Sequence, residues 1–246
     1  VLYMARALAR CGKEVIVFCK TDQPGLFDGV YYERLEKFTT YIQFNIIDVF
    51  ISVRLPEVFL HAIRARRKVL WLHDAPDQPH LICLHQARIQ DAIDRYIAVS
   101  EWQKQEFIRT FKIANDKIVV SRNGIERKYY KTYRTRRAKR LVYTSTPFRG
   151  LEILLEMFPA IRERVPQVEL FVYSSMAVYG ISPAEDQQRF GRLYDACKQP
   201  GVTLIGSIPQ PQLARELKKA RVFVYPNIFA ETSCIAALEA QAAGVP

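Results

Sequence analysis

The regular alternation of apolar runs and helix-period segments from residue 140 onward constrains this fold more than any other feature. Four short apolar runs, each long enough for one strand, are each followed by a segment with helical periodicity. Successive strand–helix units predict a parallel sheet, because a parallel neighbour is reached only through a crossover connection. The expected strands are 140–146, 168–175, 202–207 and 222–227, and the expected helices are 151–165, 187–198, 212–220 and 233–244.

The first half of the sequence shows the same alternation in a less regular form. An amphipathic segment at its start ends at Gly12. We expect an α/β protein with two Rossmann-like, parallel-sheet domains, one in residues 1–134 and one in residues 135–246. Because a helix opens the sequence and a strand is due where it stops, we also expect a fragment of a longer protein. The expected strands of this half are 14–19, 48–53, 68–73 and 95–100, and its helices are 57–67 and 101–111.

The net charge of the protein favours anionic partners but does not select one class among them. The 36 lysines and arginines exceed the 25 acidic residues, and the net charge of +11 favours anionic lipids, nucleotides, acidic glycans or nucleic acid. Eight basic side chains and no acidic one lie in residues 127–140. This run is either a solvated linker or a contact with a polyanion or an anionic membrane surface. Basic and aromatic residues mix from Tyr129 to Tyr133, but no nucleic-acid-binding motif accompanies them, so we expect no nucleic-acid partner.

The cysteines and the apolar runs indicate the compartment. Five cysteines are scattered, odd in number and never spaced as C-x-x-C, which argues against a disulfide framework and against a zinc ribbon. A cytoplasmic setting is therefore expected. No apolar run reaches the roughly 18 to 20 residues of a membrane span, so we expect any membrane contact to be peripheral, at the inner face.

Candidate site residues gather where the expected strands end. In open parallel sheets, ligands bind beyond the carboxyl ends of the strands, so polar residues and glycines that follow strands are the first candidates. A histidine in this position is also commonly a structural hydrogen-bonding group, and Asn-Gly also forms tight turns, so both alternatives remain open. The candidates are His73, Asp74, Ser100, Asn123, Gly124, Arg149, Gly150, Gly206 and Glu231.

A metal site is a rival interpretation of the segment that follows the strand at 68–73. Imidazole, carboxylate and thiolate groups all bind transition metals. Their spacing here is irregular and two prolines interrupt it, so we expect no metal ligands. The side chains concerned are His73, Asp74, Asp77, His80, Cys83 and His85.

The stretch FAETSCIAALEAQAAG, residues 229–244, combines a helix start with two glutamates. If the helix begins near Ser233, with Thr232 or Ser233 as its cap, its free N–H groups form a site for an anion such as a diphosphate. Glu239 would then lie about 9 Å along the helix, within reach of sugar hydroxyls, and Glu231 would precede the cap. The alternative is structural, because glutamate favours helices, and alanine-rich helices pack in many settings.

Residues 229–246 resemble the E-x7-E signature of retaining glycosyltransferases with the GT-B fold, in particular glycosyltransferase family 4. Other segments fall in the order of that family's motifs, namely WLHD, SEW, VVSRNGIE and RGLEILLEMFPAIRERVPQVELFVY. The resemblance covers essentially the whole sequence and is strongest in its second half. It implies a GT-B architecture, in which a first domain that binds the acceptor and a second that binds a nucleotide-sugar face a cleft.

The resemblance also implies roles for individual residues. Glu231 would lie near the donor sugar, Glu239 would hold the ribose hydroxyls, and Arg149 would replace the lysine of the family's Lys-Gly pair. A guanidinium suits the phosphates because it contacts them through two parallel hydrogen bonds. The backbone at Thr232, Ser233 and Cys234 would meet the diphosphate beside Gly150, His73 and Asp74 would match the family's HD pair, and Asn123 and Gly124 its Asn-Gly element.

The reaction implied is transfer of a sugar from a nucleotide-diphosphate donor to a hydroxyl of a glycan or lipid-linked acceptor, with no metal and no cofactor. A fixed cation and a helix terminus would stabilise the leaving diphosphate. One departure weakens the match, because many members place an arginine about five residues before the lysine, where TSTPFRG has Thr144 or Ser145. A second hypothesis is therefore a non-catalytic GT-B module that serves as a partner subunit.

Overall fold

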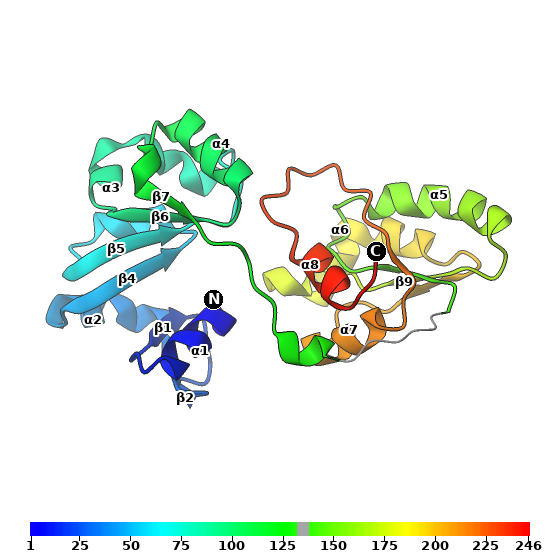
Figure 1. The fold of residues 1–246 in the computed structure, drawn as a ribbon, viewed down its shortest axis with the longest axis horizontal. Coiled ribbons are helices and arrows are strands. Elements are labelled where there is room, and N and C mark those ends of the chain that lie inside the picture. Colours follow the sequence, from blue (N-terminus) through cyan, green and yellow to red (C-terminus); the bar gives the residue numbers. More distant parts are fainter. Residues whose placement is uncertain (132–137) are drawn as a thin grey trace. The chain divides into compact units, whose positions relative to one another are not determined.

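The computed structural model describes residues 1–131 and 138–246, which divide into two compact units (Figure 1). The first unit comprises Val1–Gly124 with Glu231–Ser233, and the second comprises Ile125–Ala230 with Cys234–Pro246. The domain boundary expected between residues 134 and 135 lies outside the described residues, as does the middle of the basic run.

The first unit opens with α1 (Leu2–Arg10) and a small sheet. Gly12 follows α1 with φ +76°, the left-handed conformation that commonly ends a helix, as the sequence predicts. In the sheet, β3 is central, parallel to β1 and antiparallel to β2. The strands are β1 (Ile16–Cys19), β2 (Gly25–Phe27) and β3 (Val30–Arg34).

A four-stranded parallel sheet forms the main part of the first unit, in the order β4-β5-β6-β7. Its fully buried side chains include Leu70 and Tyr96, which pack with Phe107 in one core. The helix expected at 101–111 is confirmed as α4. The elements are α2 (Phe38–Phe44), β4 (Ile47–Val53), β5 (Ala65–Trp71), α3 (Ala87–Asp91), β6 (Arg95–Ala98), α4 (Glu101–Phe111) and β7 (Ile118–Val120).

The helix expected at 57–67 is wrong. A short 3₁₀ turn covers Pro56–Leu60, and β5 begins at Ala65, inside the expected helix. β5 pairs with β4 over its whole length, from Ile47 opposite Ala65 to Val53 opposite Trp71. This long ladder of backbone hydrogen bonds overrides a local helical pattern, because propensity is weak compared with tertiary context.

The second unit confirms the four strand–helix units predicted from the sequence. Its strands are all parallel and lie in the order β10-β9-β8-β11. The strands are β8 (Arg140–Tyr143), β9 (Glu169–Val172), β10 (Val202–Leu204) and β11 (Val222–Phe223). The helices are α5 (Leu151–Arg164), α6 (Pro183–Ala196), α7 (Gln210–Leu217) and α8 (Ile235–Ala242).

Helices cover both faces of this second sheet. Val142 and Tyr143 are adjacent in β8 and so point to opposite faces. Val142 belongs to a core with Leu217 of α7 and Ala240 of α8, whereas Tyr143 belongs to a core with Phe158 of α5. The result is the layered arrangement that parallel sheets require, since both faces are buried.

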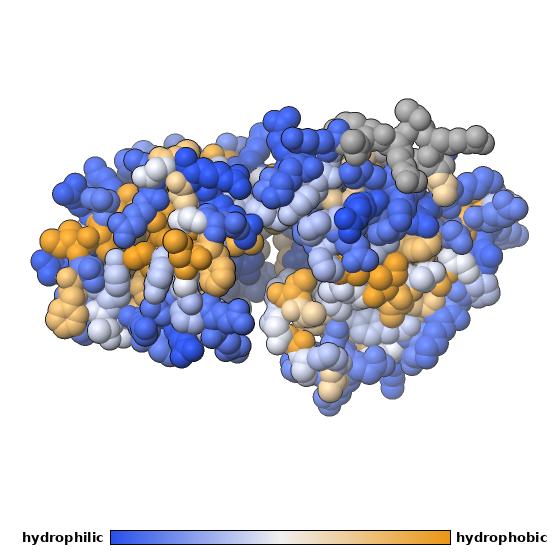
Figure 2. All heavy atoms as spheres, turned by 90° about the horizontal axis from the view of Figure 1, so that it is seen from below, coloured by the Kyte–Doolittle hydropathy of each residue, from blue (hydrophilic) through white to orange (hydrophobic). Residues whose placement is uncertain are grey.

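Six 3₁₀ turns complete the described elements, at Leu35–Lys37, Pro56–Leu60, Pro79–His85, Asn115–Lys117, Arg127–Tyr130 and Ala177–Tyr179. Around the small sheet and α2, large apolar side chains stay exposed, among them Leu26, Phe44 and Ile46. Apolar patches bordered by polar side chains are visible on both units in Figure 2. Among the described residues, the helices are too short or too polar to cross a bilayer.

Candidate active site

The loop that follows β8 is held in shape by the hydroxyl group of Tyr143. This fully buried side chain donates to the carbonyl oxygen of Thr146 at 2.7 Å and to that of Arg149 at 3.1 Å. A buried hydroxyl that serves two carbonyls of one turn fixes the backbone between them. The position of Arg149 at the carboxyl end of the sheet is therefore set by the core.

Gly150 brings this loop against the segment that follows β11. It caps α5 with φ +87°, and a Cβ atom there would lie 2.1 Å from the carbonyl oxygen of Pro226. Only glycine fits such a close approach in the left-handed conformation. The ends of two adjacent strands, β8 and β11, are thus joined at this point.

The guanidinium of Arg149 stacks on the aromatic rings beside it. Its central carbon lies 4.7 Å from the ring centroid of Phe229 and 5.5 Å from that of Phe148. Asn227 fixes Phe229 in turn, because its side-chain oxygen accepts from the Phe229 N–H at 2.9 Å. A cation fixed by ring faces at the end of the sheet is suited to bind phosphate groups.

The helix α8 starts later than the sequence predicts. It runs over Ile235–Ala242 with Cys234 at its N-cap and no side-chain cap, so the cap expected at Thr232 or Ser233 is wrong. The hydroxyl of Thr232 instead donates to the carbonyl oxygen of His73 at 2.7 Å, and Thr232 groups with the first unit together with Glu231 and Ser233. The free N–H groups of the helix start are those that follow Cys234.

Glu239 has the most perturbed carboxyl group near this helix start. Burial raises its pKa to about 7, and the hydrogen bond from Gln210 Nε2 to its Oε1 opposes this shift. Gln210 is the first residue of α7, and its Nε2 also lies 3.4 Å from the hydroxyl of Tyr130. Glu239 is four residues from the start of α8, about 6 Å along the axis. The sequence analysis missed Gln210, which carries no local signal.

In the first unit, contacts from three sides fix Asp74. Its Oδ1 lies 3.1 Å from Nη1 of Arg54, and its Oδ2 lies 3.2 Å from Nε2 of His80. Its carbonyl oxygen accepts from Nε2 of Gln103 at 2.8 Å. Arg54 has φ +70°, a left-handed conformation that is uncommon for a residue with a side chain. Asp74 is thus held in one orientation through its carboxyl group and its carbonyl oxygen.

His73 is the second member of this pair of site candidates. Burial, then the positive charge of Arg54, lowers its pKa to about 4, so the imidazole is neutral at pH 7. Its ring lies 4.8 Å from that of Trp71, measured between centroids. Both His73 Nε2 and Trp71 Nε1 are buried without a hydrogen-bond partner in the described part of the chain. Such buried polar atoms are costly unless a ligand or water pairs with them.

Ser100 and Gln103 join the Asp74 segment to α4. Ser100 is the N-cap of α4, and its hydroxyl accepts from the Gln103 N–H at 3.1 Å. Gln103 is fully buried, and its Oε1 accepts from the Val99 N–H at 2.8 Å. The sequence analysis named Ser100 but missed Gln103, although the S-x-x-Q spacing is a known helix-start signature.

Two further segments named from the sequence lie in the first unit. Asn123 and Gly124 lie in an irregular segment that is neither turn nor bend, so the alternative of a tight turn is wrong. His80 and Asp74 of the segment after β5 are in contact, and within residues 1–131 and 138–246 no group of three His, Cys, Asp or Glu side chains is placed where it could hold a metal ion.

A family model matches most of the second unit. Residues 138–246 match the family model described as "Glycosyl transferases group 1". The second unit is therefore similar to this family over these residues. The matched stretch contains the Arg149 loop, Gly150 and the helix that carries Glu239. No curated protein sequence matches the chain.

Solved structures show the fold of the whole chain. A glycosyltransferase from Rickettsia africae is 13% identical with a TM-score of 0.72, and sucrose-phosphate synthase from Thermosynechococcus elongatus is 16% identical with a TM-score of 0.70. Each match covers 99% of this chain and 73% of the other. HepE from Anabaena, solved with UDP-glucose, is 18% identical with a TM-score of 0.59 over 81% of this chain and 58% of its own. These likenesses show a GT-B fold, as the sequence predicts.

Proposed function

We propose that the protein is a retaining glycosyltransferase that moves a sugar from a nucleotide-diphosphate donor to a hydroxyl of a glycan or lipid-linked acceptor. The observation that carries this proposal is the group 1 domain with a stacked Arg149 and a buried Glu239 near the start of α8. Within this one unit, the Arg149 cation suits the diphosphate of a nucleotide-sugar and the buried Glu239 carboxylate suits its ribose.

Glu239 is the proposed partner of the donor's ribose. Its raised pKa, about 7, means that without a donor the carboxyl group is only partly ionised at neutral pH. Hydroxyl groups that donate to a carboxylate favour its charged form and lower its pKa. Gln210 orients the carboxyl group from α7, so donor binding needs little rearrangement there.

Arg149 and the start of α8 are the proposed partners of the diphosphate. The leaving nucleoside diphosphate gains negative charge as the sugar departs, and a fixed guanidinium stabilises this charge most in the transition state. The backbone N–H groups that follow Cys234 add to this stabilisation. We propose that these groups suffice, with no metal and no cofactor.

Residues of the first unit are the proposed partners of the transferred sugar. His73 stays neutral at pH 7, so it acts by hydrogen bonding rather than as a cationic acid. Asp74, held by Arg54 and His80, keeps its orientation. Glu231 is assigned to the sugar by the E-x7-E resemblance, and we propose a cytoplasmic enzyme whose lipid-linked acceptor lies at an anionic membrane surface.

A panel of UDP-, GDP- and ADP-sugars tests this proposal, with UDP-glucose included because HepE was solved in complex with it. We expect one donor to raise the melting temperature and to yield free nucleoside diphosphate when acceptor is added. Glu231→Ala should abolish turnover while the protein stays folded, and Glu239→Gln should weaken donor binding. The exposed Glu163 of α5, changed to Gln, is the matched control and should change neither.

Two results would contradict the proposal. Binding of a donor without turnover on any glycan or lipid-linked acceptor would favour the non-catalytic partner subunit, which the absent arginine near Thr144 and Ser145 already suggests. Turnover that survives Glu231→Ala unchanged would remove this residue from the site.

A further inference from the structure

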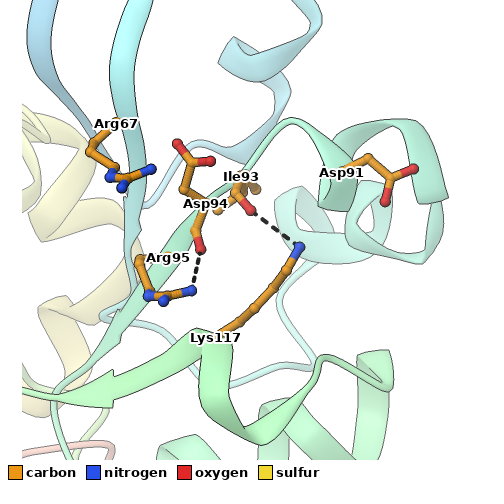
Figure 3. Close-up of a pocket in the computed structure, with 6 residues that line it drawn as sticks. All are labelled: Arg67, Asp91, Ile93, Asp94, Arg95 and Lys117. Carbon is orange, nitrogen blue, oxygen red and sulfur yellow. Dashed lines mark hydrogen bonds between the residues drawn. The ribbon is translucent and has the colours of Figure 1, made fainter.

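The first unit has a cavity at the end of its sheet opposite to His73 and Asp74 (Figure 3). Its volume is about 280 Å³. Arg67 lies near the amino end of β5, whereas His73 follows the carboxyl end of the same strand, about 20 Å away along an extended chain. The cavity is therefore separate from the candidate active site. Its lining residues are Arg67, Asp91, Ile93, Asp94, Arg95 and Lys117.

Three cationic side chains reach this cavity from three adjacent strand starts. Arg95 of β6 is in register with Val69 of β5, two residues after Arg67, so Arg67 and Arg95 share one face of the sheet. Lys117 directly precedes Ile118, which is in register with Tyr96, so it lies beside Arg95. Like charges on neighbouring strands are destabilising unless an anion compensates them.

The protein itself compensates these charges only in part. Arg95 Nη1 donates to the carbonyl oxygen of Asp94 at 3.1 Å, and Lys117 Nζ donates to that of Ile93 at 3.5 Å. Within the described ranges, neither side chain nor Arg67 has a carboxylate at ion-pair distance. Neutral carbonyls thus hold the two cations in place (Figure 3).

The two acidic residues of the lining do not remove this excess of positive charge. Asp94 Oδ2 accepts from the backbone N–H of Lys68 at 2.7 Å, which binds this carboxylate to the backbone of β5. Asp91 stands at the end of α3, across the cavity from Arg67 and Arg95 (Figure 3). Three cations therefore line the cavity with two carboxylates, one of which already accepts a backbone hydrogen bond.

We propose that this cavity binds a phosphate group, either as inorganic phosphate or as a phosphate monoester. Two guanidinium groups and an ammonium group supply the donors that phosphate oxygens require. The volume lies just below that of pockets for drug-sized ligands, so the cavity suits one small anionic group. The proposal does not depend on sugar transfer, because it involves other residues at the other end of the sheet.

Titration of the whole 246-residue chain with inorganic phosphate, followed by NMR, tests the proposal. We expect saturable shifts of the amide signals of Ile93, Asp94 and Arg95. Arg95→Gln and Lys117→Gln should each weaken phosphate binding about tenfold, because each removes a charge-assisted hydrogen bond. Unchanged melting temperatures would show that both variants fold.

Arg66→Gln is the matched control. Arg66 is the second residue of β5, on the opposite face from Arg67, and pairs with Asp48 at 3.3 Å, with both side chains largely exposed. Arg66→Gln removes one positive charge, as Arg95→Gln does, but from the other face of the neighbouring strand, and should leave phosphate binding within about twofold. An equal loss in Arg66→Gln and Arg95→Gln, or signal shifts without saturation, would overturn the proposal in favour of diffuse attraction by net charge.

Vesicles separate the two sources of the phosphate group. Sedimentation with phosphatidic acid vesicles that is lost in Arg95→Gln but not in Arg66→Gln would assign the cavity to a lipid monoester. Saturable phosphate binding without such sedimentation would assign it to the free anion. Failure of both probes to bind would refute the site.

Discussion

Gly150 has both a conformation and a position that exclude other residues. We predict that Gly150→Ala lowers the free energy of unfolding by about 2 to 4 kcal/mol, because the added Cβ meets the Pro226 carbonyl oxygen and the left-handed backbone becomes strained. Thermal or urea unfolding measures this loss. Gly180 is the matched control, since it has φ +70° and nothing within 4 Å of an added Cβ.

The Gly180 control separates the cost of steric crowding by the added Cβ from the cost of the left-handed backbone conformation. Gly180→Ala should cost about 1 kcal/mol, the price of a left-handed conformation alone. Equal losses in the two variants would show that the contact between the β8 loop and Pro226 is not tight.

Glu239 makes the stability of the protein depend on pH. Its pKa is raised from 4.5 to about 7 in the folded chain, so the stability it contributes is complete below about pH 4.5 and is lost as the pH rises through about 7. We predict that Glu239→Gln is more stable than the unsubstituted protein at pH 8 by about 1 to 2 kcal/mol, because glutamine has no carboxyl group that must ionise while buried. At pH 4.5 we expect no such gain in stability. Unfolding curves at the two values of pH measure the difference.

A matched substitution tests the cause of this dependence. Glu163→Gln removes an exposed carboxylate and should give the same small change at both values of pH. A Glu239→Gln variant whose stability follows that of the unsubstituted protein from pH 4.5 to pH 8 would contradict the buried state of Glu239.

At the scale of elements, Gln103 connects the start of α4 to the turn that carries Asp74. Its side chain accepts from Val99 and donates to the Asp74 carbonyl oxygen. We predict that Gln103→Leu, which preserves volume, destabilises the protein by about 2 to 3 kcal/mol, since it leaves two buried backbone groups unpaired. Ser100→Ala should cost about 1 kcal/mol, the usual value of an N-cap.

Hydrogen exchange distinguishes the two roles at this helix start. Gln103→Leu should increase exchange in the segment after β5 as well as in α4, whereas Ser100→Ala should affect the first turn of α4 alone. Faster exchange confined to α4 in both variants would show that Gln103 does not hold the Asp74 turn.

At the scale of the whole molecule, separate cores support the two units. Leu84 is fully buried in the first unit and Phe158 in the second, in clusters that share no residue. We predict that Leu84→Ala and Phe158→Ala each cost about 3 to 5 kcal/mol and that each accelerates hydrogen exchange mainly in its own unit. Uniform acceleration across both units in either variant would indicate a single cooperative unit.

The parts of the fold that the sequence predicts depend on local patterns. The four strand–helix units after residue 140 and α4 are confirmed because apolar periodicity and turn residues act over a few positions. The expected helix at 57–67 is wrong because pairing between β4 and β5 decided that segment. The start of α8 moved to Ile235 for a similar reason, since Thr232 contacts the His73 carbonyl oxygen far away in the sequence.

The sequence by itself determined the α/β class, the group 1 resemblance, the placement of Arg149 and Gly150 after a strand, and that of Glu239 on the last helix. Only the tertiary structure decided how these groups are held. Gln210 is 29 residues from Glu239, and burial by surrounding elements raises the pKa of that carboxyl group. Hydrogen-bond partners and burial depend on which elements pack together, and no local pattern in the chain specifies them.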